Sequence, residues 1–231
     1  MATIKTKAEI MHIAKACEIT DEIFNKIIGN FHFKTEYELF LFIRREIKNR
    51  GLREAFPPIV TSGPRAGNSI HPKPTQEGLG GFVIIDFGVR IHGYCSDMTR
   101  TIFVGTPTKK ARELYALVLK SKKAAEKKVQ AGAFCAAADA AARTTLGFYK
   151  KYFIHTLGHG VGKRIHENPK IFYKRATEIF AKNMAITIEP GIYIPEKLGI
   201  RIEDTYVVAA FDLRSLTQSP RNLLVFPPLA D

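Results

Sequence analysis

The feature that most constrains the fold is an order of predicted elements that occurs twice along the chain. In each half, two amphipathic helices precede an irregular segment rich in proline or glycine, and a pair of strands follows. The helices are expected over residues 7–28, 35–48, 108–130 and 135–149, and the strand pairs over residues 82–105 and 184–210. The second helix opens with a capping-box pattern at Thr35 and Glu38. The two halves, about residues 1–107 and 108–231, are therefore predicted to have similar structures.

Two such halves facing each other predict an α+β fold, in which a curved antiparallel sheet with pseudo-two-fold symmetry carries helices on its outside. No Ser/Gly-rich linker divides the 231 residues, so residues 1–231 are expected to form a single domain. The apolar content of 45% excludes a disordered chain. No apolar run approaches the roughly 18 residues of a membrane span, so no membrane association is expected.

Charge and cysteine content indicate the setting of the protein. The net charge of +13 would suit a nucleic-acid-binding protein, but eight of the basic residues fall between residues 108 and 130. An apolar stripe in that segment indicates a helix with a solvated lysine face, and no nucleic-acid-binding motif accompanies it. Nucleic acid is therefore not an expected partner. The odd number and wide spacing of Cys17, Cys95 and Cys135 indicate reduced thiols, and the N-terminus carries no secretory signal, so a cytoplasmic protein is expected.

The first strand pair carries two aspartates. Asp86 ends an apolar run over residues 83–85, and Asp97 begins the next β-rich run. A hairpin that turns midway between them would place their carboxylates opposite each other on one face, with Cβ atoms about 4.5–5.5 Å apart. Because a buried carboxylate must be paired, protonated or bound to a metal, the alternative is that both acids lie at an edge or in a turn.

The second strand pair carries two glutamates at matching places. Glu189 and Glu203 flank a turn-like segment over residues 195–199, which again predicts a hairpin with facing acids. Asp86 precedes Glu189 by 103 residues, and Asp97 precedes Glu203 by 106. An ion pair between Glu203 and Arg201 is the alternative, although residues two apart on a strand share a face and would line one pocket.

Three histidines, His155, His159 and His166, lie in the glycine-rich segment HTLGHGVGKRIHENP. A zinc-binding HExxH helix is excluded because its glutamate is missing and the glycines disfavour a helix. Four carboxylates and one imidazole would instead hold two divalent cations, which balance the four negative charges, activate water and polarise a carbonyl. An oxygen-rich ligand set of this kind favours Mn, Co or Zn over a thiolate site.

The segments IIDFGVRIHGYCSDMTRT, HTLGHGVGKRIHENP and IEPGIYIPEKLGIRIEDT resemble the signature segments of the pita-bread metallopeptidase superfamily, and the match extends over about residues 4–208. Only 14 residues separate Glu189 from Glu203, and Arg201 precedes the second glutamate by two. This spacing is similar to that of the aminopeptidase P and prolidase branch, which cleaves next to proline, and unlike that of methionine aminopeptidases.

The resemblance implies two divalent metal ions, with Mn first among Mn, Co and Zn. The implied metal ligands are Asp86, Asp97, His159, Glu189 and Glu203, with Asp97 and Glu203 shared between the ions. Glu189 would also move a proton from the attacking water to the leaving nitrogen. The implied substrate-contacting histidines are His71, His155 and His166, and Arg201 matches an arginine beside the metal centre.

The implied substrate is a peptide with proline at its second position, cleaved by an aminopeptidase or a dipeptidase. Two alternatives stay open: a methionine aminopeptidase, and a catalytically inactive pita-bread module that binds peptides, proteins or RNA. The catalytic pattern begins close to Met1, so the N-terminal domain of creatinase-type relatives is expected to be absent. That domain contributes to dimer formation and to limiting substrate length, so both properties stay open, and a homodimer is compatible with the resemblance.

Overall fold

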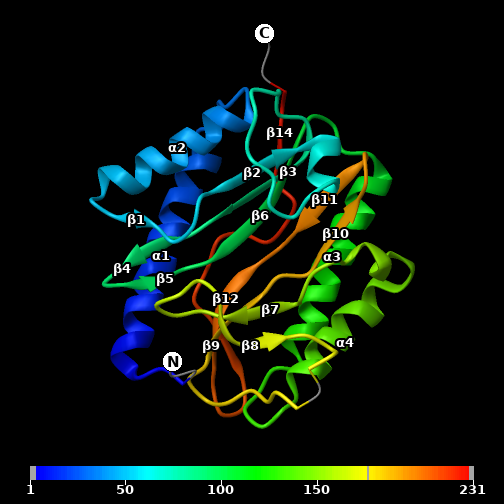
Figure 1. Cartoon of the computed structure of the whole chain (residues 1–231). Coiled ribbons are helices and arrows are strands. Elements are labelled where there is room, and N and C mark those ends of the chain that lie inside the picture. Colours follow the sequence, from blue (N-terminus) through cyan, green and yellow to red (C-terminus); the bar gives the residue numbers. More distant parts are fainter. Residues whose placement is uncertain (1–3, 176, 229–231) are drawn as a thin grey trace.

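The computed structural model of the chain describes residues 4–175 and 177–228 and contains the predicted helices (Figure 1). The helices are α1 (Lys7–Gly29), α2 (Glu36–Asn49), α3 (Lys109–Glu126) and α4 (Cys135–Leu146), with two short 3-10 helices, η1 (Gly63–Gly67) and η2 (Gly147–Tyr152). At the start of α1, the side chains of Thr6 and Glu9 each accept a hydrogen bond from the backbone N–H of the other. The predicted capping box of α2 forms only by half, because Thr35 accepts from Glu38 N–H while the Glu38 carboxylate accepts from Lys34 N–H.

Most strands belong to two larger sheets with the orders β14-β6-β3-β2 and β13-β12-β9-β7-β8. The strands are β1 (Arg53–Glu54), β2 (Ile59–Ser62), β3 (Gly81–Phe87), β4 (Val89–Ile91), β5 (Tyr94–Cys95), β6 (Met98–Val104), β7 (Gly158–Gly160), β8 (Glu167–Ile171), β9 (Ala185–Ile188), β10 (Gly191–Ile194), β11 (Leu198–Arg201), β12 (Asp204–Val208), β13 (Leu213–Ser215) and β14 (Val225–Phe226). Strands β10 and β11 form a separate hairpin, and β1, β4 and β5 form a small sheet. Neighbouring strands run antiparallel except β14 and β6, which are parallel.

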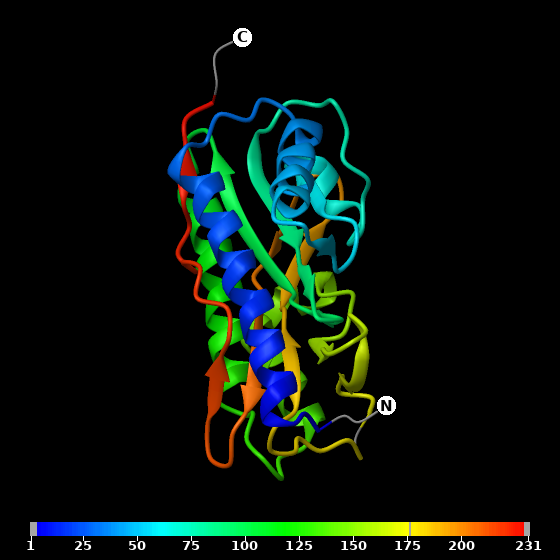
Figure 2. The same cartoon turned by 90° about the vertical axis from the view of Figure 1, so that its left-hand side faces the viewer.

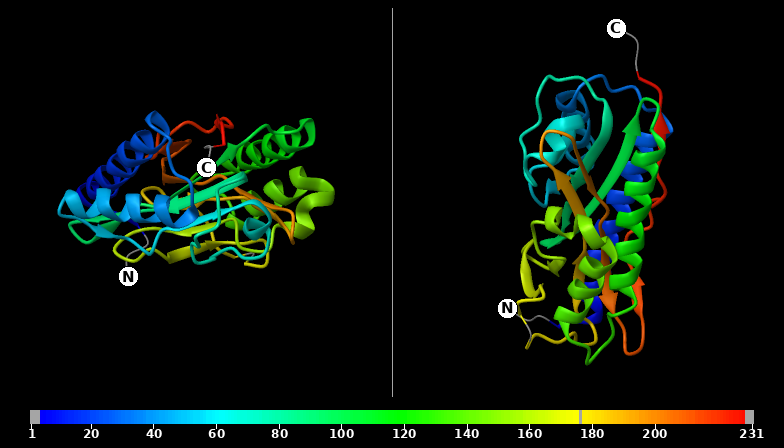
Figure 3. Two further views of the ribbon diagram at one scale, coloured as in Figure 1. Left: turned by 90° about the horizontal axis from the view of Figure 1, so that it is seen from above. Right: turned by 90° about the vertical axis from the view of Figure 1, so that its right-hand side faces the viewer.

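The helices lie outside the sheets, as predicted. Figure 3 shows α1 and α3 on one side of the sheets and the segment of β7 and β8 on the other, and Figure 2 shows the same layers from the left. One apolar cluster packs α1 and α2 against β3 and β6, and a second packs α3 and α4 against strands of the second half. This arrangement buries one face of each helix and leaves the opposite face of the sheets for the site.

The register of the first hairpin differs from the prediction. Asp86 pairs with Thr99, and continuing the same ladder sets Asp97 opposite Gly88. A two-residue turn at His92 and Gly93, both with positive φ (48° and 85°), fixes this register. The predicted turn was centred one residue too early in the chain. Moving the centre of a hairpin turn by one residue changes the partner of each strand residue by two. Since a shift of two keeps a residue on its face, Asp86 and Asp97 still point to the same side.

The second hairpin has the predicted register. The β10–β11 ladder pairs Gly191 with Arg201, and the β9–β12 ladder pairs Ile188 with Asp204, so Glu189 lies opposite Glu203 between the two ladders. The ladder opens at these two residues, because Glu189 N–H donates to Leu157 and Glu203 N–H donates to Thr99. The two glutamates therefore face one another at the point where other strands approach.

The basic face of α3 departs from the prediction at one residue. Lys122 is fully buried, and its ammonium donates to the carbonyl oxygen of Ile188 at 2.7 Å and lies 3.1 Å from Asp204. Because an unpaired buried charge is costly, Lys122 is part of the interior rather than of the solvated face. Among the helices of the described residues, none has the length and apolarity needed to cross a bilayer.

Candidate metal centre

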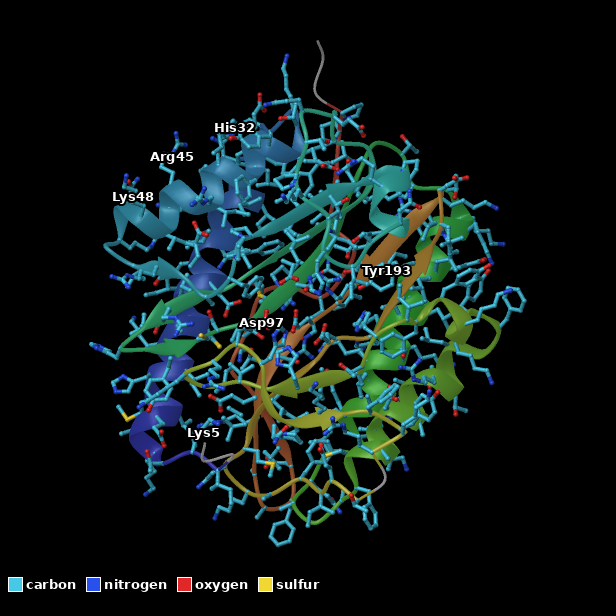
Figure 4. The ribbon with its side chains drawn as sticks, in the orientation of Figure 1. Lys5, His32, Arg45, Lys48, Asp97 and Tyr193 are labelled. Atoms are coloured by element: carbon cyan, nitrogen blue, oxygen red, sulfur yellow. The ribbon has the colours of Figure 1, made fainter. Side chains whose placement is uncertain are left out.

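All the residues predicted for the site line a single cavity of about 1030 Å³. The predicted metal ligands come from both larger sheets and from the segments between strands: Asp86 on β3, Asp97 before β6, His159 on β7, Glu189 after β9 and Glu203 before β12. His71, His155, His166 and Arg201 line the same cavity. Figure 4 shows Asp97 near the middle of the molecule, with Tyr193 above it on the side of β10.

The tightest part of the site combines residues from both halves of the chain. Asp97, His159 and Glu203 each offer one ligand atom within 4.8 Å of the others. The Nε2 atom of His159 lies 3.5 Å from an Asp97 carboxylate oxygen and 3.4 Å from one of Glu189. Its Nδ1 lies 3.1 Å from the carbonyl oxygen of Gly160, which only an Nδ1–H can bond. The bare nitrogen of the neutral ring therefore faces the carboxylates, the orientation that a metal-binding histidine needs.

The glycines beside His159 allow its strand to fit between two others. A Cβ atom at Gly158 would lie 2.1 Å from the carbonyl oxygen of Thr187, and one at Gly160 would lie 2.1 Å from that of Asn168. Strand β7 is thus held close to both β9 and β8, and a side chain on either glycine would push it away. This is the close backbone approach that the glycine-rich segment indicated.

The site carboxylates stand in surroundings that disfavour their charge. Burial, and then the neighbouring Glu203, raise the pKa of both Asp97 and Glu189 well above the usual range. Burial and the charge of Asp86 raise the pKa of Glu203 to about 7. Burial lowers the pKa of His159 to about 3, so the imidazole is neutral at physiological pH. A cation among these groups would relieve the repulsion.

Two buried carboxylate oxygens, Asp86 Oδ1 and Glu203 Oε1, have no hydrogen-bond partner among the described residues. The second oxygen of each is bonded, since Arg201 donates to Asp86 and Thr99 donates to Glu203, both at 2.6 Å. Buried polar atoms in proteins are rarely left without a partner. Orphaned carboxylate oxygens beside an unprotonated imidazole nitrogen are the donors that divalent cations such as Mn²⁺ or Zn²⁺ take, so the residues fit a metal centre.

Arg201 does not pair with Glu203, so the alternative ion pair considered for these two residues is wrong. The Arg201 guanidinium bonds Asp86 and also donates to the hydroxyl of Tyr193 at 2.6 Å. That hydroxyl lies 3.0 Å from Nε2 of His155, whose Nδ1 lies 2.7 Å from the carbonyl oxygen of Thr156. Since the carbonyl must receive a proton from Nδ1, the Tyr193 hydroxyl donates to Nε2.

Sequence reasoning missed Tyr193, Thr99 and Thr187. Burial raises the pKa of Tyr193 to about 12, which keeps its hydroxyl protonated. Thr99 also accepts a bond from Arg201 at 3.0 Å, and the Thr187 hydroxyl lies 3.3 Å from Glu189. Strand alternation could have indicated Tyr193, because residues 189, 191 and 193 point to one side. Thr99 needed the correct register of the first hairpin.

The two remaining predicted histidines line the cavity with solvent-exposed side chains. The rings of His166 and His159 have centroids 4.4 Å apart. Each imidazole is nevertheless partly desolvated by the cavity wall, and this is the main cause that lowers the pKa of His71 and of His166. Both rings are therefore neutral at physiological pH, and each has an N–H to donate.

The antiparallel sheets, the external helices and the converging acid and histidine side chains define the pita-bread class of metallopeptidase folds. Residues 11–210 match metallopeptidase family M24, and the chain belongs to this family. It is 40% identical over 227 residues to the Xaa-Pro dipeptidase of Pyrococcus furiosus, a match that covers 96% of this chain and 65% of that protein.

Solved structures show the same fold. Recombinant prolidase from Thermococcus sibiricus superposes with a TM-score of 0.92 at 39% identity, covering 96% of this chain and 62% of that one. The X-Pro aminopeptidase of Thermotoga maritima superposes with a TM-score of 0.91 at 32% identity, covering 96% and 64%. The chain thus has the pita-bread fold, and it spans about 65% of the length of the curated relatives it matches.

Proposed function

We propose that this chain carries a metal-dependent exopeptidase activity that hydrolyses the bond between an N-terminal residue and a following proline. The observation that carries the proposal is the convergence of five potential ligands in one cavity, with two of their carboxylate oxygens unbonded. Similarity to proteins named Xaa-Pro dipeptidase, prolidase and X-Pro aminopeptidase supports the specificity for proline. An imide nitrogen carries no N–H, so a site for this bond must hold the substrate through other groups.

Two divalent ions are part of the proposal, with Mn as the first candidate and Co or Zn as alternatives. The residues that would hold them are Asp86, Asp97, His159, Glu189 and Glu203. Two such ions balance the four carboxylates, lower the pKa of water and polarise the scissile carbonyl.

Glu189 is the proposed proton carrier of the reaction. Burial and the charge of Glu203 raise its pKa, so its carboxylate is a stronger base than an exposed glutamate. One of its oxygens lies 3.4 Å from Nε2 of His159, and the other lies 3.9 Å from Nδ1 of His155. The Thr187 hydroxyl donates to Glu189 at 3.3 Å and holds this carboxylate in place. Glu189 can then take a proton from the attacking water and deliver it to the leaving nitrogen.

The histidines and Arg201 are proposed to hold the substrate. The neutral rings of His71 and His166 can donate N–H groups to the scissile carbonyl oxygen as negative charge develops on it. His155 has both ring nitrogens bonded, so its contribution is to fix the wall of the cavity through Tyr193. Arg201 holds Asp86 and Tyr193 in place by donating a hydrogen bond to each.

The proposal is tested with the peptides Ala-Pro, Ala-Pro-Ala and Met-Ala-Ser, assayed with Mn, Co and Zn in turn. We expect hydrolysis only of the peptides with proline in second position and uptake of two ions per chain. Chelation and the substitution Asp97→Asn should each abolish turnover. Release of Met from Met-Ala-Ser alone would instead identify a methionine aminopeptidase. Failure to bind metal would identify an inactive binding module.

Compartment and assembly complete the proposal. The three cysteines, Cys17, Cys95 and Cys135, are unpaired and buried, which supports a reducing compartment such as the cytoplasm. Thiol titration of the protein purified without reductant should find all three free. A homodimer stays a prediction, which sedimentation of the purified chain would test.

A further inference from the structure

A lysine that the proposed chemistry does not use lies beside the metal centre. Lys170 on β8 pairs in register with His159 on β7, and both line the cavity. Side chains of directly paired residues stand on the same face of a sheet, with Cβ atoms about 4.5–5.5 Å apart. The ammonium of Lys170 has no hydrogen-bond or ion-pair partner within residues 4–175 and 177–228.

Lys170 lies on the same side of the cavity as His159. The direct pairing of the two residues across β7 and β8 puts both side chains on one face of the sheet. Lys170 is itself solvent-exposed, so its flexible side chain can turn toward a ligand without breaking buried contacts.

The charge balance of the cavity favours an anionic group on the substrate. If the proposed function holds, two divalent ions neutralise the four carboxylates. The cations that remain on the cavity wall are Lys73, Lys170 and Arg201, and the last is held by Asp86. Much of the remaining wall is apolar, with Phe40, Phe56, Pro57 and Ile70 among its side chains. An anionic group in the cavity would therefore pair with Lys73 or Lys170.

Resting on the proposed function, we propose that Lys170 binds the free α-carboxylate of a two-residue substrate, so that the site prefers Xaa-Pro dipeptides to longer peptides. In such a substrate, three bonds join the scissile carbonyl carbon to the carboxylate carbon, a path of about 4.3 Å at most. The carboxylate therefore stays within the cavity, close to His159 and the lysine across from it. In a longer peptide, a neutral carbonyl takes this place and leaves the ammonium without a counter-ion.

The test compares Ala-Pro with Ala-Pro-amide, which differ only in the charge at the C-terminus. We expect wild type to prefer the acid. In Lys170→Met the ratio of kcat/KM for acid over amide should fall about tenfold or more, mainly through KM, because a charge-assisted hydrogen bond is lost. Lys170→Arg should keep most of the preference, and raising the salt concentration should reduce it in wild type.

Two further variants serve as comparisons. Lys182 is exposed and lies outside the cavity lining, so Lys182→Met should keep the wild-type ratio. Lys73→Met tests the other free lysine of the cavity. If its ratio falls and that of Lys170→Met does not, the assignment to Lys170 is overturned. Equal losses on both substrates in Lys170→Met would also overturn it, because they would indicate a merely structural role.

A binding measurement separates this inference from the proposed function. Calorimetric titration with N-acetyl-L-proline and its amide should show that Lys170→Met weakens binding of the acid and not of the amide. If wild type hydrolyses neither peptide, the proposed function fails, while the titration still decides whether Lys170 binds a carboxylate. If wild type hydrolyses both peptides and neither the kinetic ratio nor the titration responds to Lys170→Met, only the inference fails.

Discussion

At the scale of single residues, the site consists of buried acids so close together that repulsion between their carboxylates destabilises the folded state. Asp97, Glu189 and Glu203 are packed around His159, and in the part of the chain that the structure describes Glu203 Oε1 has no hydrogen-bond partner. Packing of this kind reduces the stability of a fold unless a bound cation compensates. The metal-free protein should therefore be less stable than a variant in which one of these carboxylates is neutral.

Replacing Glu203 with glutamine tests this directly. Without metal, Glu203→Gln should increase the free energy of unfolding by about 1–3 kcal/mol, because one buried repelling carboxylate becomes neutral. With Mn at about 100 times its dissociation constant, wild type should gain about 2.7 kcal/mol and the variant much less. Urea unfolding in EDTA and in Mn measures both effects.

The matched control is Glu196→Gln, since Glu196 is an exposed glutamate in the turn of the β10–β11 hairpin. Glu196→Gln should change neither the free energy of unfolding in EDTA nor the gain in Mn by more than about 0.5 kcal/mol. A Glu203→Gln protein that is less stable than wild type in EDTA would contradict the account of repelling carboxylates.

The identity of the ligands was predictable from the sequence, and their hydrogen-bond partners were not. Asp86 and Glu203 stand out because acids follow or flank apolar strands. Alternation along the strand could have placed Tyr193 on the site face, but hydroxyl-bearing residues are ordinary in strands, so nothing marks Tyr193 or Thr99 as functional. Their hydrogen bonds to Arg201 depend on which strands meet at the site, and spacing along the chain does not contain that information.

At the scale of elements, the two hairpins show what sequence pattern determines and what turn geometry determines. Alternation and spacing were enough to place each acid on the site face of its strand. The pairing of the first hairpin depended on the positive φ of His92 and Gly93, which sets a two-residue turn. A neighbouring choice of turn would fit the same apolar pattern, so the sequence left the register of Asp86 and Asp97 open.

Strand β7 offers a test at this scale. In Gly160→Ala the new methyl group would lie 2.1 Å from the carbonyl oxygen of Asn168, a backbone atom of β8. The two strands must separate, so we expect the free energy of unfolding to fall by about 1–3 kcal/mol. Metal affinity should fall as well, because His159 precedes the displaced residue.

Urea unfolding and metal titration of Gly160→Ala measure the two effects. Gly80→Ala is the control, because a Cβ atom at Gly80 meets nothing within 4 Å. Should Gly160→Ala bind metal like wild type, strand β7 would be less tightly held than its contacts indicate.

The start of α1 predicts a pH dependence. Glu9 accepts hydrogen bonds from Thr6 N–H at 2.8 Å and from the Tyr94 hydroxyl at 2.8 Å, and these bonds lower its pKa from 4.5 to about 2. A lowered pKa in the folded state adds stability above the unfolded pKa and loses it as the pH falls. Since the carboxylate is partly exposed, Glu9→Gln should cost about 1 kcal/mol at neutral pH.

The difference between Glu9→Gln and wild type should shrink between pH 4.5 and about 2, as urea unfolding at a series of pH values would show. Glu18→Gln, on the exposed side of the same helix, should show no such change. A cost of Glu9→Gln that stays constant down to the lower end of this range would exclude the carboxylate as its source.

At the scale of the whole molecule, the two halves are joined by a buried network of charges behind the metal centre. Arg100 on β6 donates to Asp204 on β12 at 2.6 Å and to the carbonyl oxygens of Ser219 and Pro220. Asp204 also contacts Lys122 at 3.1 Å. The repeated order of elements predicted that the halves would face each other. It did not predict this network, because its members are far apart in the sequence and Lys122 follows the pattern of a solvated face.

Removing the central cation of the network should weaken the whole fold. Arg100 and Asp204 are almost completely buried, so Arg100→Met leaves a buried carboxylate with fewer partners and several carbonyls without a donor. Breaking a buried ion pair from one side costs about 3–5 kcal/mol of unfolding free energy. The exposed Arg112 on α3 provides a matched control, whose change to Met should alter stability by less than about 0.5 kcal/mol.

Urea unfolding followed by two probes, one in each half, would also show how the network acts. If Arg100 joins the halves, both probes should report a single transition in wild type and separate midpoints in Arg100→Met, because each half keeps its own apolar cluster. A loss below about 1 kcal/mol would mean that Lys122 and Arg221, which lie 3.1 and 2.8 Å from Asp204, are enough to compensate its charge. The connection between the halves would then rest on the strands around β6 and β12 rather than on the buried arginine.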